Sequence, residues 1–450
     1  MIKKLLNKSG DGESDGSFFL KKSFLALILR AGGMLTQYIF IFVIARLYGP
    51  KEQGSFTLSF TILQLFAIFS QMGLDNRLTR VIAANSDLAG KNIVRSTYLQ
   101  SLRFTLTAAF VWAILTFIAS PWLASVFFSK PELTDDLRMT CLAFVPFVII
   151  GLNSAGFRGY KNMTGFMIFR ALQPLIAAIL LLIFYYGKME FGAIQAYSIT
   201  TFIVCIFSFT TWYKFSKIGD AETVTTPNAV SVITESMPLM LTGSIFFILG
   251  WTDNIILGIF RTSEEVGIYD MAYKLSTLSA IVLLAVNAIQ APTFAQLYSK
   301  GEMKRLQGFV FRSTKLLFYT SLPITLVLCF FPEWILGIFG PGFKAAALTL
   351  IILSIGNFVN SITGSIGILL QMSGKQKEYN RIIMIAAGGS ILLNFILIPR
   401  IGIVGAAISS TVAKIFQNLA SVAYAKKSMG ILSLYLPGID KIFKVKNKNN

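Results

Sequence analysis

The hydrophobic residues of this chain fall into long stretches, about twelve in all, separated by short polar segments. A helix that crosses the hydrocarbon core of a bilayer needs about 20 mostly apolar residues, and most of these stretches are that long. Hydrophobic residues make up 54% of the chain and charged residues only 14%. We therefore predict an all-α integral membrane protein whose function concerns movement of a solute or lipid across the membrane.

The pattern predicts helices separated by one longer polar stretch near the middle of the chain. The predicted helices span residues 22–47, 54–74, 99–126, 139–157, 166–186, 192–213, 236–260, 268–291, 312–331, 345–371, 379–398 and 402–425. The first apolar stretch is too long for the core of a cleaved signal peptide, so we interpret it as a retained helix.

These helices group into two bundles of six with three flanking segments. The predicted organisation is a cytoplasmic N-terminal segment (1–21), an N-terminal six-helix bundle (22–214), a cytoplasmic linker (215–235), a C-terminal six-helix bundle (236–425) and a basic cytoplasmic tail (426–450).

The formal net charge of +19 comes from 40 Lys and Arg residues against 21 Asp and Glu residues. In a soluble protein this excess would suggest nucleic-acid binding, but here the basic residues gather in alternate loops and in both terminal segments. Short cytoplasmic loops of membrane proteins carry such an excess. We therefore predict that both termini are cytoplasmic and that nucleic acid is not a partner. Few basic residues fall in the predicted outer loops: Lys51, Lys130, Arg138, Lys188, Arg261, Lys344 and Arg400.

Several chemistries are disfavoured by what the sequence lacks. It has no His, and its three Cys residues lie far apart inside apolar stretches. A His-ligated metal, a Ser-His-Asp triad and a disulfide framework are therefore not expected. The sequence contains neither a P-loop nor a Gly-rich dinucleotide motif. We predict a protein without a cofactor or metal that is not an enzyme.

An internal repeat relates the two halves of the chain. Gly54 and Gly267 both open predicted helices and lie 213 residues apart, and Phe166 and Tyr379 repeat the same offset. Two halves in the same orientation imply a pseudo-twofold axis along the membrane normal. Secondary transporters with parallel repeats expose their binding site to each side of the membrane in turn by rocking one bundle against the other.

The end of the first predicted helix carries a family-like motif. Residues 44–54 read Ile-Ala-Arg-Leu-Tyr-Gly-Pro-Lys-Glu-Gln-Gly, residues 71–74 read Gln-Met-Gly-Leu, and residues 402–407 read Gly-Ile-Val-Gly-Ala-Ala. This pattern resembles the polysaccharide exporters, or O-antigen flippases of the Wzx type. They belong to the multidrug/oligosaccharidyl-lipid/polysaccharide exporter superfamily, which also holds the multidrug and toxic-compound extruders (MATE) and the lipid II flippases.

The resemblance implies a V-shaped, MATE-like carrier of the bacterial cytoplasmic (inner) membrane. Its expected substrate is an undecaprenyl-diphosphate-linked oligosaccharide repeat unit, moved from the inner to the outer leaflet for assembly of O-antigen, lipopolysaccharide or another surface polysaccharide. A polysaccharide polymerase and a chain-length regulator are candidate partners, and the carrier is expected to work as a monomer.

Charged residues inside predicted membrane helices are the candidate functional residues, because burying charge in a bilayer is costly. Lys414 lies near the middle of helix 402–425, Arg30 lies in the first helix beside Gly32 and Gly33, and Arg170 lies in helix 166–186. We predict that these three cations line a cavity that binds diphosphate or an acidic sugar. The alternatives are pairing with a neighbouring helix for Lys414 and snorkelling to the interface for the two arginines.

Asp253, in the outer half of helix 236–260, is the candidate coupling residue, since a desolvated carboxylate can take up and release a proton. Its alternative role is a salt bridge to another helix. Asp270 and Lys274 are spaced i, i+4, which favours an ordinary pair on one helix face.

Two other functions remain open from the sequence. A multidrug or small-solute exporter of the same superfamily is one, although exporters of cationic drugs favour acidic residues in the first half, where Arg30 stands. An integral membrane glycan polymerase or ligase is the other, although such an enzyme typically has a large outer loop. The longest predicted one here is short, at about residues 128–139.

Overall fold

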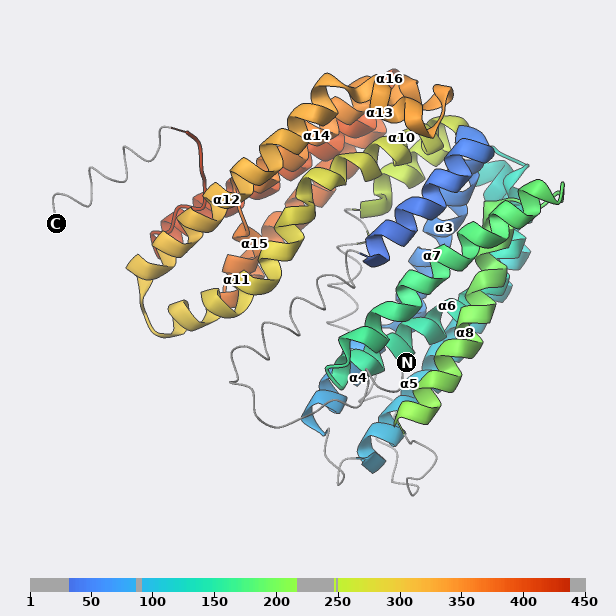
Figure 1. Ribbon diagram of the computed structural model, residues 1–450, viewed down its shortest axis with the longest axis horizontal. Helices are drawn as coiled ribbons and strands as arrows, with labels where there is room; N and C mark the ends of the chain where they lie inside the picture. Colours follow the sequence, from blue (N-terminus) through green and yellow to red (C-terminus); the bar gives the residue numbers. More distant parts are fainter. Residues whose placement is uncertain (1–31, 86–90, 217–246, 248–249, 438–450) are drawn as a thin grey trace.

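The computed structural model describes residues 32–85, 91–216, 247 and 250–437. Those residues contain helices and connecting segments and no β-strand. The helices of the N-terminal half of the described chain form a first bundle (Figure 1). They are Gly32–Leu47, α3 (Gly49–Gln71), α4 (Leu74–Ala84), α5 (Lys91–Trp122), the π-helical turn η2 (Leu123–Phe127), α6 (Leu133–Gly159), α7 (Met163–Tyr186) and α8 (Ala193–Ser216).

The second bundle begins with a helical segment at residues 250–260. The elements that follow are α10 (Ser263–Ser276), η4 (Thr277–Ala280), α11 (Ile281–Ser299), α12 (Met303–Phe330), α13 (Pro332–Phe339), η5 (Pro341–Ala346), α14 (Ala347–Ile362), α15 (Ile366–Met372) and α16 (Gln376–Met429).

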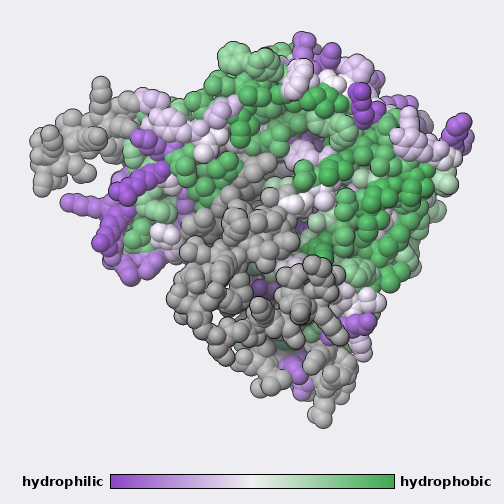
Figure 2. All heavy atoms as spheres, viewed as in Figure 1, coloured by the Kyte–Doolittle hydropathy of each residue, from purple (hydrophilic) through white to green (hydrophobic). Residues whose placement is uncertain are grey.

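The two bundles meet at one end and diverge toward the other, so that the molecule is V-shaped (Figure 1). Within the described residues, eight helices are long and apolar enough to cross a membrane. On the face shown in Figure 2, hydrophobic side chains cover the sides of the bundles and hydrophilic ones gather at the helix ends. The predicted all-α membrane fold with two bundles is confirmed.

At the joined end, α3 and α10 pack backbone against backbone. A Cβ atom on Gly54 would overlap the carbonyl oxygen of Ser263, and a Cβ atom on Gly267 would overlap that of Pro50. Only glycine allows so close an approach. Pro50 and Ser263 are separated by the same 213 residues as Gly54 and Gly267. The two contacts are therefore images of each other across a pseudo-twofold axis, as the repeat predicts.

A lysine also crosses between the bundles at this end. Lys130 is 6% exposed and donates hydrogen bonds to the carbonyl oxygens of Phe128 and of Gly258, which lies in the second bundle. Burial lowers the pKa of Lys130, and the carboxylates of Glu132 and Glu265 oppose that shift. The lysine thus closes the C-terminal end of helical segment 250–260, where backbone carbonyls lack partners within the helix.

Several helix boundaries differ from the prediction. The amphipathic helix α4 was not predicted, because its polar face lowers the mean hydropathy of the segment. Predicted helix 268–291 is divided among α10, η4 and α11. The last two predicted helices lie within α16 on either side of a kink at Ile401 and Gly402, where φ of Gly402 is +60°, so the break predicted between them is confirmed. The starts of predicted helices 22–47 and 236–260 lie outside the described residues.

Predicted helix 345–371 is interrupted between α14 and α15. Gly364 there has φ of +67°, which favours glycine. The segment after α16 provides partners for the carbonyl groups freed by the break. The backbone N–H of Tyr435 donates to the Ile362 carbonyl at 2.9 Å, and the Ser433 hydroxyl donates to the Thr363 carbonyl at 2.6 Å. The break is therefore stabilised by the end of the described chain.

Candidate functional site

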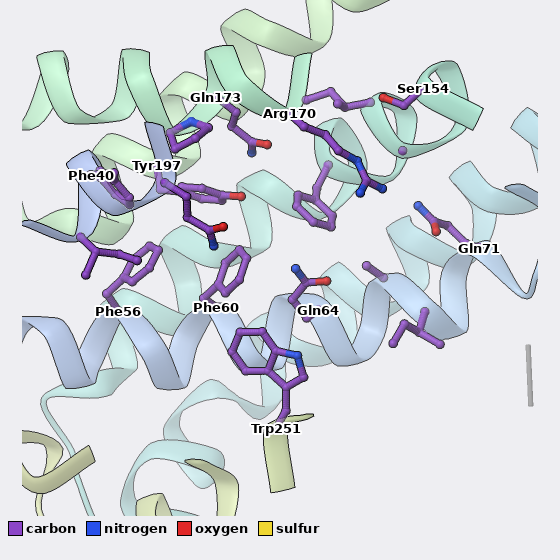
Figure 3. A pocket seen from close by; sticks show the side chains of 18 of the residues that line it. Phe40, Phe56, Phe60, Gln64, Gln71, Ser154, Arg170, Gln173, Tyr197 and Trp251 are labelled. Carbon is purple, nitrogen blue, oxygen red and sulfur yellow. The ribbon is translucent and has the colours of Figure 1, made fainter. Parts of the chain in front are cut away.

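A cavity of about 340 Å³ lies on the face of the first bundle that looks toward the second. Most of its lining comes from the first bundle, while Trp251 and Lys274 belong to the second (Figure 3). Its polar lining side chains are Gln37, Gln64, Gln71, Asp75, Ser154, Arg170, Gln173, Tyr197 and Lys274. A volume in this range is typical of ligand pockets.

Most of the polar groups in this lining are uncharged. Gln64 and Gln71 lie two turns apart on one face of α3, and both reach the cavity (Figure 3). Neither amide has a hydrogen-bond partner among the described residues. Ser154 is 1% exposed, and within the same part of the chain its hydroxyl is also unpartnered. Gln173 differs, because its amide donates to Thr201 at 2.7 Å.

The charged lining residues include two ion-paired side chains. Lys274 lies 2.5 Å from the carboxylate of Asp270, and Asp75 lies 4.0 Å from Arg158. Arg170 projects from α7 toward the cavity, with its guanidinium 5.0 Å from the centre of the Phe166 ring (Figure 3). Together with Asp270 and Arg158, the described lining contains three cations and two carboxylates, so that the net charge of these five residues is one positive unit.

Aromatic rings form another wall of the cavity. The Trp251 ring centre lies 5.6 Å from that of Phe60, which packs in turn on Tyr197 and Phe56 at 5.3 and 5.5 Å. Trp251 of the second bundle thus packs on the aromatic rings that the first bundle contributes to the cavity (Figure 3). The arrangement offers a flat apolar surface beside the amides.

Asp270 connects the cavity to the joined end. Its carboxylate is 2% exposed and accepts hydrogen bonds from Gln53 at 2.8 Å and Thr57 at 3.0 Å, both on α3 of the first bundle. It also pairs with Lys274 on its own helix. One carboxylate therefore holds two bundles together and orients a cation at the cavity, a role that helix spacing alone did not predict.

Asp253 lies in a polar cluster inside the second bundle. It is 4% exposed and accepts hydrogen bonds from Tyr269 at 2.7 Å, from the Asn394 amide at 2.6 Å and from the Ser410 hydroxyl. The Oδ1 atom of Asn394 is buried without a partner in the described part of the chain. The cluster thus combines a buried carboxylate with an acceptor that no described residue uses.

Lys414 lies one turn beyond Ser410 on α16. Its ammonium donates to Asn357 at 2.8 Å and lies 5.9 Å from the centre of the Tyr273 ring. The Asn357 amide in turn donates to Ser276 at 3.0 Å. Lys414 and Asp253 also attract each other electrostatically. Both residues therefore belong to one network inside the second bundle.

The structure separates the predicted site residues into two places. Arg170 and Lys274 line the cavity, while Lys414 and Asp253 lie in the polar cluster of the second bundle. Arg30 lies outside the described residues. The sequence analysis overlooked Gln64 and Gln71, although their spacing of seven residues inside an apolar helix is a usable signal.

The sequence profile of the family described as "Polysaccharide biosynthesis protein" matches residues 19–298, more than half of the chain. The chain belongs to this family. The MatE family profile also matches, over residues 238–399. The fold is one that solved transporters share.

Two relatives come from archaea. The chain is 28% identical over 194 residues to a probable low-salt glycan biosynthesis flippase, Agl15, of Haloferax volcanii, a match that covers 43% of this chain and 41% of Agl15. It is 26% identical over 388 residues to an uncharacterised membrane protein of Methanocaldococcus jannaschii, covering 80% of this chain and 75% of that one. The chain thus matches less than half of Agl15.

Solved structures share the fold at low sequence identity. An inward-facing MATE multidrug transporter aligns with a TM-score of 0.72 and 14% identity, covering 90% of this chain and 98% of that one. The lipid II flippase MurJ, in an inward closed conformation, aligns with a TM-score of 0.69 and 16% identity, covering 91% of this chain and 87% of MurJ. Both support the MATE-like architecture.

Proposed function

We propose that the chain is a flippase that moves a polyprenyl-diphosphate-linked oligosaccharide from the inner to the outer leaflet of a cytoplasmic membrane. In a bacterium the carrier lipid would be undecaprenyl diphosphate and the product O-antigen or another surface polysaccharide. The family description, the flippase name of Agl15 and the fold shared with MurJ support this proposal.

The observation that carries the proposal is a polar cavity lined by both bundles of a V-shaped membrane protein. Arg170 is suited to a phosphate group, because guanidinium binds phosphate oxygens in a bidentate manner. The amides beside it suit sugar hydroxyls. The apolar sides of the bundles leave the prenyl chain in lipid while the headgroup crosses.

The orientation follows from the charge pattern. The predicted cytoplasmic loops, including residues 158–161 and 300–305, lie at the separated ends of the bundles. With both termini cytoplasmic, the V would open toward the cytoplasm, where lipid-linked repeat units are made. Closing that end and opening the α3–α10 contact would then release the headgroup outward.

Coupling to an ion gradient would use Asp253. Its buried carboxylate and the unpartnered Asn394 oxygen can receive a proton or another monovalent cation. Uptake of that cation would neutralise the carboxylate of Asp253, which lies in the same network as Lys414. The changed electrostatic interaction would then favour a different packing of α16 against α10.

The test is deletion of the gene in its native host, followed by complementation. We expect loss of the surface glycan and accumulation of lipid-linked repeat units on the cytoplasmic face, with rescue by the wild type. Arg170→Gln should rescue at least tenfold less well, since a charge-assisted hydrogen bond contributes about 1.5–3 kcal/mol. Arg138→Gln is the control, because this arginine forms a surface pair with Asp135. An unchanged surface glycan, with no second exporter in the genome, would instead favour a small-solute exporter.

A further inference from the structure

We infer that the amide-lined cavity is a subsite for an uncharged sugar of the transported headgroup, which makes the protein selective for neutral over acidic glycans at this position. The inference rests on the proposed flippase function. It reverses the expectation of a strongly cationic cavity, which would favour an acidic sugar.

Three polar side chains of the cavity have unused hydrogen-bonding capacity. Gln64, Gln71 and Ser154 all face the cavity, and none of their side chains has a hydrogen-bond partner among the described residues. A buried polar group without a partner costs free energy, about 1–3 kcal/mol. Ser154 is buried on α6 and lines the cavity, so a hydrogen bond from its hydroxyl to a ligand would offset that cost.

These three side chains suit a ligand group that both donates and accepts hydrogen bonds. A glutamine amide has two donors and an acceptor with two lone pairs, and a serine hydroxyl both donates and accepts. A sugar hydroxyl needs both kinds of partner. A carboxylate or phosphate only accepts, so half of the capacity of these amides would stay unused beside an anion.

The described lining has few positive charges. Lys274 is neutralised by Asp270 at 2.5 Å, Asp75 has Arg158 nearby, and Arg170 is the other cation of the described lining. A sugar with its own carboxylate would add to the two negative charges of the diphosphate, and the described lining holds no further cation to offset it. Desolvating such a charge without a partner is unfavourable.

The shape of the cavity agrees with these groups. Trp251 and Phe60 form an apolar wall beside the amides, which suits a pyranose ring because one of its faces presents C–H groups. Gly151 makes room for Gln71, since a Cβ atom there would overlap the Gln71 amide nitrogen. The Gln71 amide therefore depends on a glycine of the neighbouring helix α6.

The experiment uses the full-length chain in proteoliposomes with two polyprenyl-diphosphate-linked disaccharides that differ at one carbon. One carries neutral hexoses, and the other carries a uronic acid in place of one hexose. We expect the neutral compound to cross about tenfold faster. Gln64→Leu and Gln71→Leu should each slow it about threefold to tenfold, the effect of one lost hydrogen bond. Gly151→Ala should act like Gln71→Leu, while Gln296→Leu on an exposed position of α11 should match the wild type.

The outcomes separate the two proposals. A correctly folded wild type that moves neither compound overturns the flippase function. A wild type that moves both at equal rates, with the glutamine variants unchanged, leaves the flippase function standing and overturns the neutral-sugar subsite. Faster transport of the uronic acid compound also overturns it. Melting temperatures in detergent within a few degrees of the wild type show that a slowed variant is folded.

Discussion

Removing the carboxylate of Asp270 should open the joined end of the molecule. Asp270→Ala deletes two hydrogen bonds from α3 and leaves Lys274 without its partner. Hydrogen bonds to charged groups contribute about 1.5–3 kcal/mol each. Because Lys274 is 19% exposed at a polar cavity and can be hydrated there, we expect a net loss of about 2–4 kcal/mol from the contact between the bundles. This free energy corresponds to a factor of roughly 30 or more in the equilibrium constant between molecules whose joined end is closed and molecules in which it is open.

The assay is a distance measurement by pulsed electron paramagnetic resonance. Spin labels are attached to cysteines at Ser129 and Glu264, which are exposed positions on opposite bundles at the joined end, in a chain whose three native cysteines are replaced by alanine. In the wild type a short distance between the two spin labels should dominate. In Asp270→Ala a longer distance between them should become populated. Asp135→Ala, which removes a surface pair with 87% exposure of the aspartate, should leave the distribution unchanged. An Asp270→Ala distribution that matches the wild type, in a folded protein, would refute the reasoning.

Three further substitutions test other parts of the structure. Gly267→Ala should lower the melting temperature and slow transport, because the added Cβ atom overlaps a carbonyl oxygen of α3. Overpacking of this kind costs about 1–3 kcal/mol. Full transport activity in this variant would contradict the backbone contact. Asp253→Asn should keep the fold but abolish the response of transport to an imposed ion gradient; a retained response would exclude this residue from coupling. Lys414→Met should reduce transport at least tenfold, since it removes the hydrogen bond to Asn357. Lys377→Met, at an exposed position, should have no effect. Equal transport rates for the two variants would show that Lys414 is only a packing residue.

The fold was predictable from the sequence to the extent that hydropathy encodes it. Long apolar stretches define α5, α6 and α7 because a membrane helix must be apolar along its length. The repeat of Gly54 and Gly267 also predicted the pseudo-twofold relation, since glycine is required where backbones touch. The break at Gly364 changes the local hydropathy too little to be predicted in this way, and helix α4 is too polar to stand out as an apolar stretch.

The site was less predictable, because it depends on contacts between residues far apart in the chain. Asp270 was expected to pair only with Lys274, and nothing in the local sequence points to Thr57 on the other bundle. The sequence indicated the charged residues as candidates, while most polar side chains of the cavity are uncharged, among them four amides such as Gln64. The placement of Lys414 away from that cavity follows from helix packing, which hydropathy does not encode.

The pairing of Thr57 with Asp270 has a consequence for how such a chain can arise. The two residues are equivalent positions of the repeat, 213 residues apart, and lie together at the axis. A homodimer of one six-helix unit would place identical residues there: two threonines without a charge, or two aspartates that repel each other. Only two halves that differ in sequence can set a hydroxyl donor opposite a carboxylate at the axis. The hydrogen bond between Thr57 and Asp270 therefore depends on the divergence of the two halves, which this chain carries in one polypeptide.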